Sequence, residues 1–284
     1  MTFAGFDAKR LRTELRNGVG RIIVDAPPAQ VITWRLVHEL AGACTAAADD
    51  VDVRVVVLES ADPAFWLTHF DVEAILAIPL DGPAEARSEL HAFYRACLAF
   101  RTSPVPSIAL IDGRVGGGGA ELAASLDMRF GSLERTVVTQ MEVPLGIVPG
   151  GGGTQLLPEL VGRGRALEMV LGGSEIDAAR AEAWGWLNRA LPAAELRPFV
   201  DELAERIATF DPAVVRRAKR AVALGDEAAE LTGRLRTEAL LFDECIRLPR
   251  SAASMRRFLD LGGQTPEGEH RVGPLAAEAA SGGA

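Results

Sequence analysis

The stretch Ile111-Asp-Gly-Arg-Val-Gly-Gly-Gly-Gly-Ala-Glu-Leu-Ala-Ala-Ser-Leu-Asp127 carries the strongest signal in this chain. Its four contiguous glycines follow a short apolar run and precede a segment with helical spacing. The first N–H groups of a helix have no partner within the helix and point outward, with the positive end of the helix dipole behind them. Such a turn is suited to holding a negatively charged oxygen, although the glycines alone fit a tight turn that binds nothing equally well.

Two common nucleotide-binding motifs do not fit this turn. A Walker loop requires Gly-Lys followed by Ser or Thr, and no lysine follows these glycines. A dinucleotide fingerprint requires G-x-G-x-x-G, whereas here the glycines are contiguous and Glu121 follows closely. If the turn binds an anion, the anion is therefore held in another way.

The segments on either side of the glycines alternate between β-rich and helical patterns, which predicts an α/β architecture. Strands are expected over residues 20–25, 53–58, 107–111, 127–130 and 136–139, and helices over 35–48, 72–78, 85–100 and 154–161. From residue 193 onward the pattern is almost wholly helical. We therefore predict a core over residues 1–208 and a helical region over 209–284, whose last stretch, 273–284, is Ala/Gly/Ser-rich and expected to be a flexible tail.

Composition favours a cytoplasmic protein and is compatible with a small anionic ligand. The net charge is −9 and the basic residues are scattered, so we expect no nucleic-acid partner. The three cysteines match neither a disulfide framework nor a zinc site, which favours free thiols in a reducing compartment. Residues 1–10 show no apolar signal core and no apolar run reaches membrane-spanning length, so we expect no membrane partner.

A second motif narrows the interpretation. It reads Glu142-Val-Pro-Leu-Gly-Ile-Val-Pro-Gly-Gly-Gly-Gly-Thr-Gln155, and a third stretch reads Gly164-Arg-Ala-Leu-Glu-Met-Val-Leu-Gly-Gly173. In this order and spacing, the two Gly/Glu motifs resemble the signature of the crotonase (enoyl-CoA hydratase/isomerase) superfamily. The resemblance extends from about Gly18 to Leu261 and implies a core of repeated ββα units that form a spiral, followed by an all-helical region.

The resemblance also implies an oxyanion hole, in which two peptide N–H groups hold the oxygen of an acyl-coenzyme A thioester. One N–H falls on Gly118. The other comes from the stretch Phe65-Trp-Leu-Thr-His-Phe-Asp71, where we align Thr68 with the residue that donates it. Further substrate-binding residues are expected near these donors: Trp66, His69, Phe70 and Gly117. The large side chains replace small ones of the family pattern and should alter the shape of the acyl pocket.

Glu121 and Glu142 align with the two catalytic glutamates of the superfamily. A pair of carboxylates around one water can deprotonate the water and deliver a proton to carbon, so we favour hydration of a trans-2-enoyl-CoA to the 3-hydroxyacyl-CoA. Two alternatives are an isomerase or another acyl-CoA chemistry on the same scaffold, and a non-catalytic scaffold with a binding or RNA-associated role. Without the other, Glu121 would be interpreted as a stabilising carboxylate at a helix start, and Glu142 as a solvated loop charge.

The resemblance implies no metal and no cofactor beyond the coenzyme A of the substrate. It also implies a homotrimer, or two trimers paired into a homohexamer. Apolar residues of the C-terminal helices, such as Leu231, Leu235, Leu240 and Leu241, should dock on the core or on a neighbouring copy.

Overall fold

The large sheet of the protein has the order β1-β2-β3-β5-β7-β10. In the computed structural model, residues 8–80, 82–84, 90–223 and 228–281 are described. The strands are β1 (Leu11–Arg16), β2 (Val19–Val24), β3 (Val55–Ser60), β5 (Ser107–Ile111), β7 (Met128–Ser132) and β10 (Arg189–Leu191). All neighbouring strands are parallel except β1 and β2, which form an antiparallel pair.

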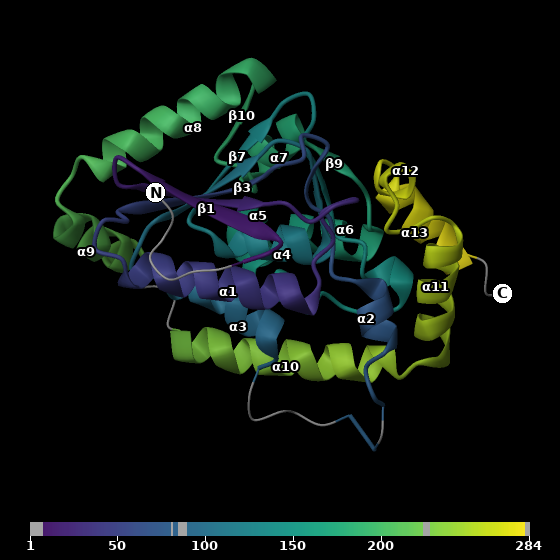
Figure 1. The fold of residues 1–284 in the computed structure, drawn as a ribbon. Helices are drawn as coiled ribbons and strands as arrows, with labels where there is room; N and C mark the ends of the chain where they lie inside the picture. The colour runs from purple at the N-terminus through teal and green to yellow at the C-terminus, as the bar shows by residue number, and fades with distance from the viewer. Residues whose placement is uncertain (1–7, 81, 85–89, 224–227, 282–284) are drawn as a thin grey trace.

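Helices cover both faces of this sheet, as Figure 1 shows. On one face lies α8 (Ala193–Ala208), whose Leu196, Val200 and Ala204 pack against side chains of β3 and β5. On the other face lie α1 (Trp34–Asp49), α3 (Ala92–Thr102) and α4 (Gly117–Ser125), which share the largest apolar core. Burial on both faces explains why β3 and β5 are nearly continuous apolar runs in the sequence.

A second, smaller sheet positions the glycine-rich turn. It has the order β4-β6-β8-β9, formed by β4 (Phe65–Leu67), β6 (Arg114–Gly116), β8 (Val137–Thr139) and β9 (Ile176–Asp177). Each of β3, β5 and β7 is followed along the chain by a strand of this small sheet and then by helical structure. The repeated strand-strand-helix units confirm the predicted α/β fold class.

The remaining helices before the C-terminal region are α2 (Val72–Leu76), η1 (Val143–Leu145), α5 (Gly153–Val161), α6 (Arg163–Gly172) and α7 (Ala178–Trp184). The helix expected over 85–100 begins later, because α3 starts after its cap at His91, and residues 85–89 lie outside the described part. The three-residue strands β4 and β6 were not predicted, because short strands leave little period-2 signal. The six-residue strand β1 was not predicted either, although buried and exposed residues alternate along most of it.

The C-terminal helices, except the first of them, bury side chains against the rest of the chain. They are α9 (Pro212–Val222), α10 (Ala228–Ile246), α11 (Pro249–Asp260), α12 (Pro266–Glu269) and α13 (Val272–Ser281). The prediction of a flexible tail was wrong for residues 273–281, because Leu275, Ala276 and Ala279 of α13 are buried against α11 and η1. The prediction failed because alanines offer little apolar surface, but their small side chains allow the helices to come close together.

In the part of the chain described, no helix is both long enough and apolar enough to cross a membrane.

Candidate active site

The glycine-rich turn opens α4 directly beneath β4. A Cβ atom at Gly119 would lie 2.0 Å from the Leu67 carbonyl oxygen, so only glycine allows this close approach. Gly117 adopts a left-handed φ of 43°, which also favours glycine. The N–H of Gly118 belongs to the first turn of α4 and therefore has no partner within the helix.

The structure does not support Thr68 as the predicted second N–H donor, and it places the Phe70 N–H beside Gly118 instead. The Thr68 N–H donates to the Gln30 carbonyl at 3.3 Å, which leaves it no role toward a ligand. The Phe70 N–H enters no hydrogen bond among the described residues, and a Cβ at Gly118 would lie 3.3 Å from this nitrogen. The Phe70 and Gly118 N–H groups thus face the same place. Phe70 is two residues further along the chain than Thr68, the residue that the sequence alignment suggested.

The two predicted glutamates meet in one pocket. Glu121 lies on α4, and its Oε1 accepts hydrogen bonds from the Gly151 and Gly153 N–H groups, each at 2.8 Å. Glu142 precedes η1, and the side-chain amide of Gln140, with its nitrogen toward the carboxylate, lies 2.8 Å from Glu142 Oε2. Both glutamates are buried, at 2% and 7% exposure, and both line the pocket.

Burial sets the proton affinity of both groups. It raises the pKa of Glu121 well above its usual range, and the neighbouring Glu142 and Glu238 carboxylates raise it further. Burial likewise raises the pKa of Glu142 to about 7, although its backbone hydrogen bond and the nearby His69 lower it. A carboxyl group with a pKa near neutrality can both accept and donate a proton, as acid–base catalysis requires.

Glu238 on α10 is a third buried carboxylate, and the sequence analysis missed it. It accepts hydrogen bonds from the Gly152 N–H at 2.8 Å and the Thr154 N–H at 2.9 Å, and from the Thr154 hydroxyl. The N–H groups of residues 151 to 154 therefore alternate between Glu121 and Glu238. Its position in the sequence could have revealed it, because Glu238 lies on the apolar face of its helix, where an apolar residue is expected. The other residues of that face are Leu231, Leu235, Phe242 and Ile246.

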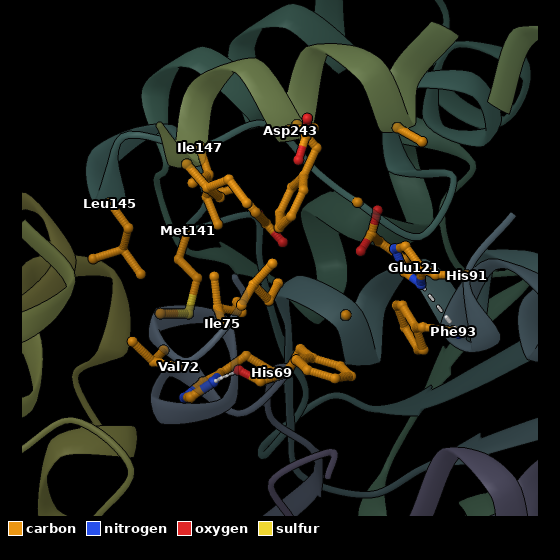
Figure 2. Close-up of a pocket in the computed structure, with 18 of the residues that line it drawn as sticks. His69, Val72, Ile75, His91, Phe93, Glu121, Met141, Leu145, Ile147 and Asp243 are labelled. Carbon is orange, nitrogen blue, oxygen red and sulfur yellow. Dashed lines mark hydrogen bonds between the residues drawn. The ribbon is translucent and has the colours of Figure 1, made fainter. Parts of the chain in front are cut away.

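The pocket has a volume of about 180 Å³ and mostly apolar walls. Figure 2 shows Glu121 and His91 on one side and Met141, Leu145 and Ile147 on the other. Four residues of α10 complete the wall, namely Ala239, Phe242, Asp243 and Ile246. The predicted boundary at residue 208 therefore does not separate the site from the C-terminal helices.

The other predicted substrate-binding residues divide into two groups. His69 and Phe70 line the pocket. Trp66 does not, because its side chain points into the main apolar core and is 1% exposed. Gly117 is not a lining residue either, since it lies between His69 and Glu142: a Cβ there would be 3.1 Å from the His69 Cβ and 3.0 Å from Glu142 Oε1.

Comparison with known proteins gives consistent matches over most of the chain. The family model for enoyl-CoA hydratase/isomerase matches residues 14–264. A mitochondrial protein of Dictyostelium discoideum, described as an enoyl-CoA hydratase, is 29% identical over 249 residues, which cover 87% of each chain. Carnitinyl-CoA dehydratase of Proteus mirabilis is 31% identical over 212 residues, covering 75% of this chain and 79% of that one.

The solved structures agree. A crystal structure described as an enoyl-CoA hydratase from Streptomyces avermitilis is 38% identical, with a TM-score of 0.86, and covers 96% of this chain and 99% of the other. An enoyl-CoA hydratase/isomerase from Xanthobacter autotrophicus is 26% identical, with a TM-score of 0.77, and covers 96% of this chain and 97% of the other.

Proposed function

The chain belongs to the enoyl-CoA hydratase/isomerase family, which acts on acyl-CoA substrates, and we propose that it hydrates trans-2-enoyl-CoA to 3-hydroxyacyl-CoA. One observation carries the proposal: Glu121 and Glu142 line the same buried pocket as Gly118 and Phe70. The pocket thus offers two proton-transfer groups beside two free N–H donors.

The N–H groups of Phe70 and Gly118 stabilise the charge that develops on the thioester oxygen. When water adds to the β-carbon, the electrons of the double bond move toward the carbonyl, and this oxygen becomes negative. Fixed backbone donors aimed at that oxygen need no reorganisation, and one such donor is worth about a hundred- to a thousandfold in rate.

Glu121 and Glu142 divide the proton transfers between them. One carboxylate takes a proton from water as the water oxygen bonds to the β-carbon, and the other, protonated, gives a proton to the α-carbon. The product then contains all the atoms of the substrate plus one water. The raised pKa of both groups supports this division, because one proton shared by the pair near neutral pH supplies both a base and an acid.

Apolar residues of the pocket receive the acyl chain in this proposal. Ile75, Met141, Leu145 and Ile147 form a wall beside the carboxylates, and Phe242 and Ile246 of α10 face them. These residues exclude water from all but the reacting position, which strengthens the electrostatic interactions inside.

A double-bond isomerase is the second candidate. Isomerisation from a 3-enoyl to a 2-enoyl thioester needs one carboxylate that shuttles a proton. Glu121 Oε1 accepts from two backbone N–H groups, whereas Glu142 lies against the side-chain amide of Gln140, so the two carboxylates are held in different ways. This asymmetry is the observation that favours isomerisation.

Product analysis in heavy-oxygen water separates the two reactions. A series of trans-2-enoyl-CoA and 3-enoyl-CoA thioesters of increasing length is incubated with the protein, and the products are identified by mass. Hydration places the heavy oxygen on the β-carbon. Efficient 3-enoyl turnover without label would replace the hydratase assignment by the isomerase.

We also propose that the chain assembles as a homotrimer or homohexamer and that it is located in the cytoplasm. Leu231 and Leu235 are 3% and 4% exposed and pack within their own chain, so they do not call for a neighbouring copy. Leu241 is 47% exposed on the same helix, and Leu171 of α6 is 62% exposed. Light scattering at micromolar concentration tests the proposal, and a strict monomer would contradict it.

A further inference from the structure

His69 is buried between two oxygen atoms that both call for a donor. Its Nδ1 lies 2.9 Å from the Phe70 carbonyl oxygen, and its Nε2 lies 2.9 Å from Glu269 Oε1. A carbonyl oxygen can only accept. A neutral imidazole carries one N–H, whereas the imidazolium carries two, so the charged ring satisfies both contacts.

The hydrogen bonds of Glu269 indicate that it is the ionised partner. Its Oε1 also accepts from the Gln264 N–H at 2.8 Å, so this oxygen acts as an acceptor from two sides. Burial lowers the pKa of His69, but the Glu269 carboxylate outweighs it and the net direction is upward. Burial raises the pKa of Glu269, yet His69 and the more distant Arg114 lower it overall.

The segment that carries Glu269 is tied to the loop that carries Phe70. The Gln264 side chain accepts from the Val72 N–H at 2.6 Å and donates to Asp71 Oδ1 at 3.2 Å. The chain from Gln264 to Glu269 therefore contacts the loop at His69 and at two residues beyond it, Asp71 and Val72, and fixes the position of the imidazole ring.

His69 also faces the acid–base pair. Glu142 lies on the other side of Gly117 and acts electrostatically on the His69 ring, while the Phe258 ring of α11 contacts it edge-on, with ring centroids 5.7 Å apart. Glu121 and Glu238 add two further buried carboxylates to the same region. One positive charge here offsets a local excess of negative charge.

We propose that Glu269 is a positioning residue that holds His69 as a buried imidazolium at the edge of the pocket, where its charge stabilises the ionised form of Glu142 and the negative thioester oxygen. The charge state of His69 stands on geometry alone. Its effect on catalysis rests on the proposed hydratase function, so the two parts are tested separately.

Nitrogen NMR of the histidine rings tests the charge state in the unmodified protein. The chain has four histidines, and the His69 signals are assigned by their loss in His69→Gln. At pH 7.5 we expect both ring nitrogens of His69 to be protonated. A neutral His69 tautomer at that pH overturns the proposal, whether or not any enoyl-CoA is turned over.

Glu269→Gln tests the effect on the site, with Glu267→Gln as the matched control. Gln keeps an acceptor for Nε2 but removes the charge, whereas Glu267 is exposed on the same short helix. In Glu269→Gln we expect kcat to fall about ten- to a hundredfold, less than on loss of a direct oxyanion donor. The acid limb of the kcat/KM profile should move up by about one pH unit, because Glu142 loses its stabilising cation.

A merely structural role would lower kcat and leave the acid limb in place, and that result overturns the electrostatic part. Should Glu269→Gln fail to fold, the NMR measurement on the unmodified protein still decides the charge state, and the less disruptive Glu269→Asp provides the pH profile. If His69 is charged but the protein turns over no enoyl-CoA, the hydratase function fails and the buried imidazolium stands.

Discussion

Replacing Glu238 by alanine should loosen the loop that holds Glu121. Glu238 accepts from two backbone N–H groups, those of Gly152 and Thr154, in a buried setting. Leaving a buried donor unpaired costs about 1–3 kcal/mol each, so we expect a loss of about 2–6 kcal/mol in the free energy of unfolding. For a chain of this size that corresponds to a fall in Tm on the order of 10 °C.

Enzyme kinetics should show the same coupling. The N–H groups of Gly151 and Gly153, which alternate with those two donors along the loop, bind Glu121. Loosening the loop therefore displaces a proposed catalytic carboxylate. The conservative change Glu238→Gln retains one acceptor oxygen and removes a negative charge. Because the Glu238 charge raises the pKa of both Glu121 and Glu142, the acid limb of kcat/KM should move to lower pH in Glu238→Gln.

The assays are urea unfolding followed by circular dichroism, and enoyl-CoA turnover across pH 5 to 9. Glu244→Ala is the matched control, because Glu244 is exposed on the same helix, and we expect a change within about 0.5 kcal/mol. If Glu238→Ala unfolds at the same urea concentration as the control and keeps full activity, Glu238 does not hold the loop and the reasoning is refuted.

Three further outcomes follow from the same contacts. Phe70→Pro removes the proposed second oxyanion donor and should lower kcat about a hundred- to a thousandfold, whereas Thr68→Ala, which keeps its backbone N–H, should retain most activity; full activity of Phe70→Pro in steady-state assays would contradict the Phe70 assignment. Gly119→Ala should prevent correct folding, because the new Cβ would collide with the Leu67 backbone. Gly164→Ala should raise Tm slightly, because no atom lies within 4 Å of a Cβ at that position; similar melting curves for the two variants would show that β4 can move. The pKa of Glu142 is raised from 4.5 to about 7 in the folded protein, so its contribution to stability is complete below pH 4.5 and is lost as pH rises through 7. Urea unfolding should therefore give a lower free energy of unfolding at pH 8 than at pH 5.5. A higher free energy of unfolding at pH 8 would contradict a raised pKa of the buried Glu142 carboxyl.

The sequence predicted the parts of the fold that repeat or that depend on buried strands. The runs at 53–58 and 107–111 are β-branched and apolar, and both became central strands, β3 and β5. The helix α13 escaped prediction because its alanines carry no strong amphipathic signal, and its burial depends on partners in η1 and α11.

In the site, motif spacing located Gly118, Glu121 and Glu142. The first two lie in one short segment, and Glu142 lies in the second motif. The donor at Phe70 was missed because which N–H faces inward depends on how Gln30 and Ile32 pair with that loop, and no sequence motif encodes this pairing. Glu238 and Glu269 were missed because each reaches the site from a distant helix, more than a hundred residues along the chain from Glu121.

The central claim is that Glu121 and Glu142 act together on one water. The direct measurement is the rate at which heavy oxygen from water appears on the β-carbon of the product, for the unmodified protein, Glu121→Gln, Glu142→Gln and the double variant. Glu182→Gln, an exposed carboxylate on α7, is the control, and the affinity for a coenzyme A thioester should barely change in any of them.

We expect each single change to slow label incorporation about a hundred- to ten-thousandfold. The double variant should be far less than multiplicatively worse, because groups that act as a unit are not additive. One sensitive glutamate, with 3-enoyl turnover and no label in the product, would contradict the central claim.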